Sequence, residues 1–180
     1  MFITAPAAHV IPDPPPTPTN FSLPLTPTEI TRFPPSLKEP QQCPYYTVAD
    51  YEALYLSGQA TPTDVALALL PLIRRDVSPA ANHSAAWMSA RVDLILKAAE
   101  DSTRRYRENR PLGPLDGVPA AVKDDFDVDG YEMTMGSSRN YAGRAVQSGS
   151  STNWSVKKLQ EAGVIIFGKL AMHEYGLGMS

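Results

Sequence analysis

The sequence has one cysteine, three histidines and no long hydrophobic run, and each shortage excludes a class of structure. Cys43 cannot form a disulfide within the chain, which suits a reducing compartment and predicts a cytoplasmic protein. The histidines are isolated from one another, so neither a metal site nor a cofactor is expected. The apolar stretch 65–73 is too short to span a membrane, and Pro71 interrupts it.

An excess of positive charge is also absent. The formal net charge is −3, whereas proteins that bind nucleic acid or anionic membranes favour a basic surface. The start of the chain lacks a basic segment followed by an apolar core, so it does not resemble a signal peptide. We therefore expect neither a nucleic-acid partner nor a membrane partner.

Proline is plentiful but unevenly placed. Twelve of the 18 prolines lie in residues 1–44, and this density removes backbone donors and prevents continuous helix or central strand. The sequence predicts an extended or disordered lead over 1–44 and one folded unit over 45–180. A plain linker and a polyproline II ligand for an SH3-type partner are both open interpretations of the lead.

Three helices are predicted in the first part of the folded unit, over 48–57, 61–75 and 90–108. Thr61 is a good N-cap, Pro62 suits the first helical position, and Pro71 predicts a kink or an early end. The third helix places its apolar residues on one face at helical spacing. Its closing arginines, Arg104, Arg105 and Arg107, are expected to stay solvated and to complement the helix dipole.

The second part of the folded unit alternates strand, helix and strand. Residues 118–123 and 164–167 are continuous apolar runs, which are typical of parallel strands covered on both faces. Between them, Ser151 or Thr152 is expected to cap a helix that ends near 162. This order predicts an α/β fold with one parallel βαβ unit.

Lys123 closes the first of these apolar runs and carries the clearest chemical signal in the chain. An ammonium there must be paired or deprotonated, and desolvation disfavours the charged form of lysine. Lys123 is therefore a candidate proton acceptor. The alternative that the residues leave open is a lysine that emerges at the strand end and pairs with Asp124 or Asp125.

The stretch that contains Lys123 is similar to a block of the amidase signature family. Residues 113–124 match its Gly-Pro-Leu-x-Gly-Ile/Val-Pro-x-x-Val-Lys-Asp pattern, in which the lysine is catalytic. Three further segments, at 56–66, 158–169 and 172–176, resemble blocks of the same family in the same order. The resemblance implies that the chain is the N-terminal portion of the family's α/β/α sandwich.

The resemblance also implies a mechanism and a list of site residues. Family members use a Ser, cis-Ser and Lys arrangement to hydrolyse carboxylic amides through an acyl-enzyme, and both serines lie in loops beyond the position where this chain stops, Ser180. Lys123 is the expected catalytic residue. Gly136 and Ser137, which match a loop lining the site, and Asp124 beside the lysine are the expected lining residues.

An acidic run after Lys123 imitates the start of a calcium-binding loop. Asp125, Asp127 and Asp129 occupy the first, third and fifth positions, and Gly130 the sixth. The twelfth position should be a glutamate but is Gly136, so no calcium site is expected and a solvated loop is predicted.

These observations lead to one interpretation with open alternatives. The sequence predicts an amidase-like protein whose substrate, if the protein is complete, is a small amide, and which is inactive as this truncated chain. A non-catalytic remnant and a binding or adaptor protein are the alternatives. Because apolar strands with unpaired edges promote association, we expect the isolated chain to be marginally stable, to aggregate, or to depend on a protein partner.

Overall fold

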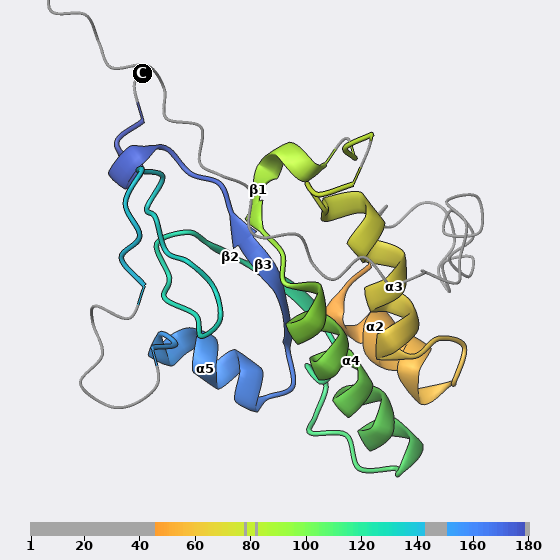
Figure 1. Ribbon diagram of the computed structural model, residues 1–180. Helices are drawn as coiled ribbons and strands as arrows, with labels where there is room; N and C mark the ends of the chain where they lie inside the picture. Colours follow the sequence, from red (N-terminus) through yellow and green to blue (C-terminus); the bar gives the residue numbers. More distant parts are fainter. Residues whose placement is uncertain (1–45, 78, 82, 143–150, 179–180) are drawn as a thin grey trace, which may run out of the picture.

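The computed structural model describes residues 46–77, 79–81, 83–142 and 151–178. The predicted proline-rich lead and Cys43 therefore lie outside the described residues. These residues form four helices and three strands, with a 3-10 turn before β1 and another after β3 (Figure 1). In chain order they are α2 (Val48–Leu56), α3 (Pro62–Ile73), η1 (Ser84–Ala86), β1 (Trp87–Ser89), α4 (Val92–Arg107), β2 (Pro119–Lys123), α5 (Trp154–Glu161), β3 (Ile165–Leu170) and η2 (Glu174–Gly176).

The starts of α2 and α3 follow the capping signals. Thr47 and Thr61 each form a capping box with the aspartate three residues on, which satisfies backbone N–H groups that a helix leaves open at its start. Helix α3 continues through Pro71 and ends at Ile73, two residues before the predicted end at 75. At α5 the prediction was wrong, because the cap is Asn153, whose Oδ1 accepts a hydrogen bond from Ser155 N at 3.0 Å.

The sheet has the order β1-β3-β2. Strands β2 and β3 are parallel, as the apolar runs and the helix between them predicted. Strand β1 is antiparallel to β3 and was not predicted, because its three residues are all half-buried and show neither an apolar run nor an alternation. The fold is therefore a mixed α/β arrangement rather than a parallel unit alone.

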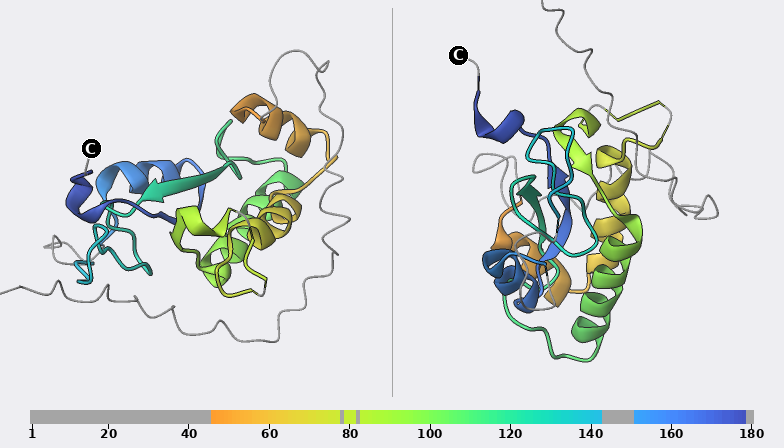
Figure 2. Two further views of the ribbon diagram at one scale, coloured as in Figure 1. Left: turned by 90° about the horizontal axis from the view of Figure 1, so that it is seen from above. Right: turned by 60° about the vertical axis from the view of Figure 1, so that its left-hand side comes forward.

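Two apolar cores lie on opposite faces of the sheet. Helices α3 and α4 cover one face, where Ile165 and Phe167 of β3 point, and α5 covers the other, where Ile166 points (Figure 2). Strand β3 is buried on both faces, as predicted for a central parallel strand. Within the described residues, no helix is long and apolar enough to cross a membrane.

Strand β2 lies at the edge of the sheet, so its first three residues are half-buried and the prediction of two covered faces was wrong for it. Val118 O accepts from Ile165 N, and Asp124 N donates to Leu170 O. Alternation therefore turns the main-chain groups of Pro119, which has no N–H, and of Lys123 away from β3. The free edge of β2 is thus short and partly without donors.

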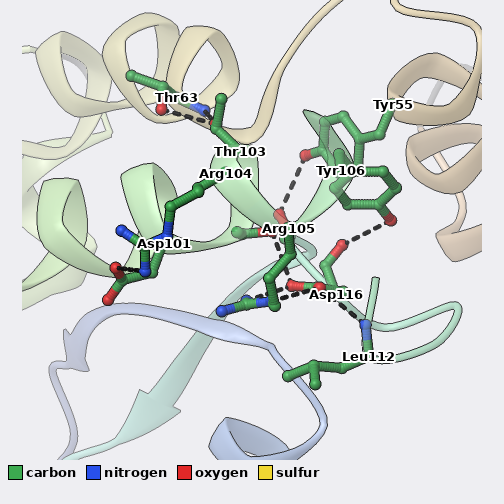
Figure 3. A network of polar contacts seen from close by, with 11 residues as sticks. Tyr55, Thr63, Asp101, Thr103, Arg104, Arg105, Tyr106, Leu112 and Asp116 are labelled. Atoms are coloured by element: carbon green, nitrogen blue, oxygen red, sulfur yellow. Dashed lines mark hydrogen bonds and ion pairs between the residues drawn. The ribbon is translucent and has the colours of Figure 1, made fainter. Parts of the chain in front are cut away.

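A buried carboxylate, Asp116, joins α4 to the turn before β2 (Figure 3). Its oxygens accept hydrogen bonds from Arg105 Nε and Nη2 at 2.8 and 2.5 Å and from Ser102 Oγ at 2.7 Å. The main-chain N–H of Leu112 donates to Oδ2 at 3.0 Å. Two tyrosines hold the neighbouring carbonyls, since Tyr106 donates to Asp116 O and Tyr55 to Gly117 O. We call these six residues, Tyr55, Ser102, Arg105, Tyr106, Leu112 and Asp116, the Asp116 network.

This network corrects one expectation about α4. Arg105 is not a solvated last-turn cation, because its guanidinium forms a two-pronged ion pair with Asp116. Burial alone would raise the pKa of the Asp116 carboxyl, but hydrogen bonds from Arg105, from the Leu112 N–H and from Ser102 outweigh burial and leave the pKa below its ordinary value.

Removal of this carboxylate should destabilise the fold strongly. We expect Asp116→Ala to lower the free energy of unfolding by about 3 kcal/mol, because it leaves a partly buried guanidinium and two other donors without their acceptor. The matched control is Asp101→Ala, which breaks the exposed ion pair to Arg104 and should cost less than about 1 kcal/mol. Urea unfolding measures both, and equal costs would contradict the role of the Asp116 network.

The same carboxylate should make stability depend on acid pH. Because folding lowers its pKa, Asp116 contributes stability that is fully present above the unfolded value of about 4 and is lost as the pH falls through the lower folded-state value. Urea midpoints measured from pH 6 down to pH 2 should therefore fall less steeply below about pH 4 in Asp116→Ala than in the unaltered chain. Parallel curves would contradict this assignment.

Candidate functional site

The carboxyl ends of β2 and β3 lie side by side, and the predicted site residues gather there. Lys123 is the last residue of β2 and pairs in register with Leu170 at the end of β3. The loop that follows β2 and the turn η2 that follows β3 meet at the same end (Figure 1). In open α/β sheets this end of the parallel strands is where ligand sites form.

Lys123 itself is not buried among the described residues. Its side chain is 50% exposed, and its Nζ lies 3.1 Å from Asp125 Oδ2. Val122 packs on the face that α5 covers, so alternation directs Lys123 to the opposite face at the open edge. The desolvated lysine inferred from the apolar run is therefore replaced by an exposed ion pair, the alternative that the sequence left open.

The buried lysine at this end of the sheet is Lys169, which sequence reasoning did not single out. It is fully buried, and its Nζ lies 3.2 Å from Asp124 Oδ1 and 3.2 Å from the carbonyl oxygen of Glu132. The contact with Oδ1 is an ion pair without hydrogen-bond alignment. The predicted solvated loop is therefore wrong at Asp124, because this residue is half of a buried ion pair.

A β-bulge explains why Lys169 reaches Asp124. Ala120 pairs with Ile166 but Ala121 pairs with Gly168, so β3 has one extra residue at this point. Gly168 has φ +149°, and a Cβ there would lie 2.1 Å from Ser89 O, so only glycine fits. After the bulge, Lys169 faces the loop that follows β2 instead of the face where Phe167 packs.

Asp124 also organises the loop that contains Gly136. Its Oδ2 accepts from Thr134 N at 3.0 Å, from Thr134 Oγ1 at 2.5 Å and from Gly136 N at 3.4 Å. Met135 and Gly136 both have positive φ, and the N–H groups of Thr134 and Gly136 both point to the carboxylate. The predicted lining residues Asp124 and Gly136 are therefore brought together by direct contact.

Ser137 is buried, and its hydroxyl stabilises the same loop. Its Oγ donates to Thr134 O at 2.8 Å and accepts from Arg139 N at 3.2 Å. Lys123 is paired with a different residue, Asp125. The arrangement gives Ser137 the geometry of a turn-stabilising hydroxyl rather than that of a nucleophile facing a base.

Two tyrosines at this end of the molecule were missed by sequence reasoning, because nothing in their spacing connects them. The hydroxyls of Tyr141 and Tyr175 lie 2.8 Å apart, and their rings meet edge to face with centroids 6.4 Å apart. Their hydrogen bond lowers the pKa of Tyr141 and raises that of Tyr175. Tyr175 N also donates to Met135 O at 2.7 Å, so η2 is attached to the loop by main chain and side chain.

The acidic run after Lys123 is hydrogen-bonded to the residues that directly precede α5. Asp127 O accepts from Asn153 N at 2.7 Å, and Asp129 Oδ1 accepts from Ser151 N at 2.8 Å. Thr152, one of the two expected caps, accepts from Asp129 N through its hydroxyl. In the part of the chain that the structure describes, no three His, Cys, Asp or Glu side chains form a group that could hold a metal ion.

Comparison with known proteins points to the same region. A family model described as Amidase matches residues 73–180, which include Lys123 and both strand ends. The chain is 33% identical over 132 residues to one subunit of the mitochondrial glutamyl-tRNA(Gln) amidotransferase of Mus musculus, covering 73% of this chain and 23% of that protein. It is 32% identical over 137 residues to a fatty acid amide hydrolase of Arabidopsis thaliana, covering 74% and 21%.

Solved structures agree with these sequence matches. The native peptide amidase of Stenotrophomonas maltophilia superimposes with a TM-score of 0.59 at 27% identity, over 73% of this chain and 26% of that one. A structure described as amidase aligns with a TM-score of 0.57 at 25% identity. The chain thus spans about a quarter of the length of the relatives it matches.

Two glycines with nearly equal φ allow a matched test of the loop. Gly136 has φ +72°, and a Cβ there would lie 2.6 Å from Met172 O; Gly58 has φ +71° with open space around it. We expect Gly58→Ala to cost about 1 kcal/mol for its conformation alone. Gly136→Ala should cost a further 1 to 3 kcal/mol, roughly, from overlap with main-chain oxygens. Urea unfolding measures both, and equal costs would contradict the close approach of loop and η2.

Proposed function

Because the chain belongs to the amidase signature family, we propose that it forms part of a hydrolase of carboxylic amide bonds in which Lys123 is the base. The observation that carries this proposal is the place of Lys123. It ends a parallel strand inside the matched region, and half of its side chain is accessible at an open sheet edge. A nucleophile that belongs to another segment could therefore approach it.

The chemistry follows from what a lysine amine can do. As a neutral base, Lys123 would take a proton, through a bridging serine, from the serine that attacks the amide carbonyl. The C–N bond would then break, the amine would leave with the proton that the base had taken, and water would hydrolyse the acyl-enzyme to give the carboxylic acid and the free serine. The described residues supply the base, and both serines would come from outside them.

The surroundings of Lys123 suggest that the 180-residue chain does not perform this reaction alone. A proton acceptor must be a neutral amine, which burial favours and a neighbouring carboxylate opposes. Lys123 is half exposed and lies beside Asp125. Ser137, the serine that the sequence predicts to line the site, directs its hydroxyl to Thr134 O. We propose that the rest of an amidase domain covers this edge. It would then exclude water from the Lys123 side chain and supply the nucleophile.

The first test is the activity of the chain itself. Purified 180-residue protein should release no ammonia or acid above background from simple aliphatic and aromatic amides, because it offers no described serine aligned with its base. Mass-resolved product detection over hours gives the required sensitivity. Turnover that disappears in Lys123→Ala would overturn the proposed inactivity and would make Ser137→Ala the next variant to measure.

The second test supplies the missing portion. We would fuse the full 180-residue chain to the Stenotrophomonas maltophilia peptide amidase from which the matching quarter has been removed, and measure hydrolysis of a peptide amide. Lys123→Met in this fusion should lower kcat by about 100-fold or more, the usual contribution of a general base. Lys158→Met is the control, because Lys158 is an exposed residue of α5 that pairs with Glu161 and lies over the Trp154 ring. Hydrolysis that survives Lys123→Met would exclude Lys123 as the base.

A further inference from the structure

The Lys169–Asp124 pair is the most enclosed ion pair that the structure describes. Both side chains are at most 1% exposed. Removing two charges from water costs several kcal/mol for each ion, and a buried pair recovers this only when other hydrogen bonds complete it. Asp124 has those bonds, from Thr134 and Gly136, and Lys169 has the carbonyl of Glu132. A pair that costs so much to bury is a candidate for fixing one conformation.

The pair involves the residue directly after Lys123, where the main chain leaves the sheet. Asp124 N donates to Leu170 O at 3.1 Å, which carries the β2–β3 pairing one residue beyond Lys123. The Asp124 side chain points to the opposite side of the strand from Lys123 and is held there by Lys169. Asp124, which follows Lys123 directly in the sequence, is therefore paired with Lys169, and Lys123 is paired with Asp125 instead.

We propose that Lys169 is a positioning residue for Lys123. Through its ion pair with Asp124, it holds the end of β2 in register with β3 and keeps the loop containing Gly136 against this end, so that Lys123 leaves the sheet edge in one direction. This inference rests on the proposed role of Lys123 as the base, and it assigns Lys169 no contact with a substrate.

The first measurement needs no activity. Amide hydrogen exchange of the 180-residue chain would be followed at Asp124, Thr134 and Gly136, whose N–H groups donate within this arrangement. In Lys169→Met these three amides should exchange about tenfold faster or more, while Ala99, buried in α4, keeps its rate. A uniform increase that includes Ala99 would show a contribution to overall stability alone and would overturn the proposal.

A double variant keeps the test informative if Lys169→Met does not fold. Asp124→Asn combined with Lys169→Met removes the ion pair without leaving a buried carboxylate uncompensated. Because neutral acceptors form weaker hydrogen bonds than carboxylates, the amides of Thr134 and Gly136 should still exchange about tenfold faster than in the unaltered chain. Exchange as slow as in the unaltered chain would overturn the proposal.

The second measurement uses the fusion to the peptide amidase. The double variant should lower kcat at least about tenfold with little change in KM, because misplacing a base affects the transition state and not substrate binding. Lys158→Met should change neither constant. A fusion that is inactive, or active without Lys123, refutes the proposed function. A fusion that depends on Lys123 but not on the Lys169–Asp124 pair refutes only the present inference.

Discussion

Two buried carboxylates fix the strand that carries Lys123, one before it and one after it. Asp116 precedes β2 and is held by Arg105 of α4, and Asp124 follows β2 and is held by Lys169 of β3. An edge strand pairs on one side only, and β2 is half-buried over much of its length. Hydrophobic burial alone therefore does not determine the position of β2 tightly. The two ion pairs supply the fixed geometry that the apolar contacts of β2 do not.

The two ends differ in what the carboxylate organises. At the amino end, the Asp116 network joins helices to a turn, and its effect is on the stability of the fold. At the carboxyl end, Asp124 gathers main-chain N–H groups of a loop with two consecutive positive φ values, next to the place where a base would act. Backbone conformations of this kind persist only where the surroundings determine them, and they concentrate at functional sites.

The sequence predicted much of the fold and less of the site, for physical reasons. Local signals were sufficient where the cause is local: threonine caps start α2 and α3, and apolar runs identified β2 and β3 as parallel strands. The matched motif located Lys123. The burial of Lys169 was not predictable, because it requires a bulge at Gly168 and a partner, Asp124, that lies far away in the sequence. The ion pair of Arg105 was missed for the same reason, since its partner lies on another element.

The claim that β2 is fixed at both ends is tested most directly by amide exchange of the unaltered chain. Alternation directs the N–H groups of Ala120 and Val122 toward β3. If the ends are held, these two amides should exchange as slowly as that of Ala99 in the buried face of α4, although β2 lies at the edge of the sheet. Exchange of Ala120 and Val122 at the rate of the surface loops, with Ala99 protected, would show a fraying edge strand and would contradict this account.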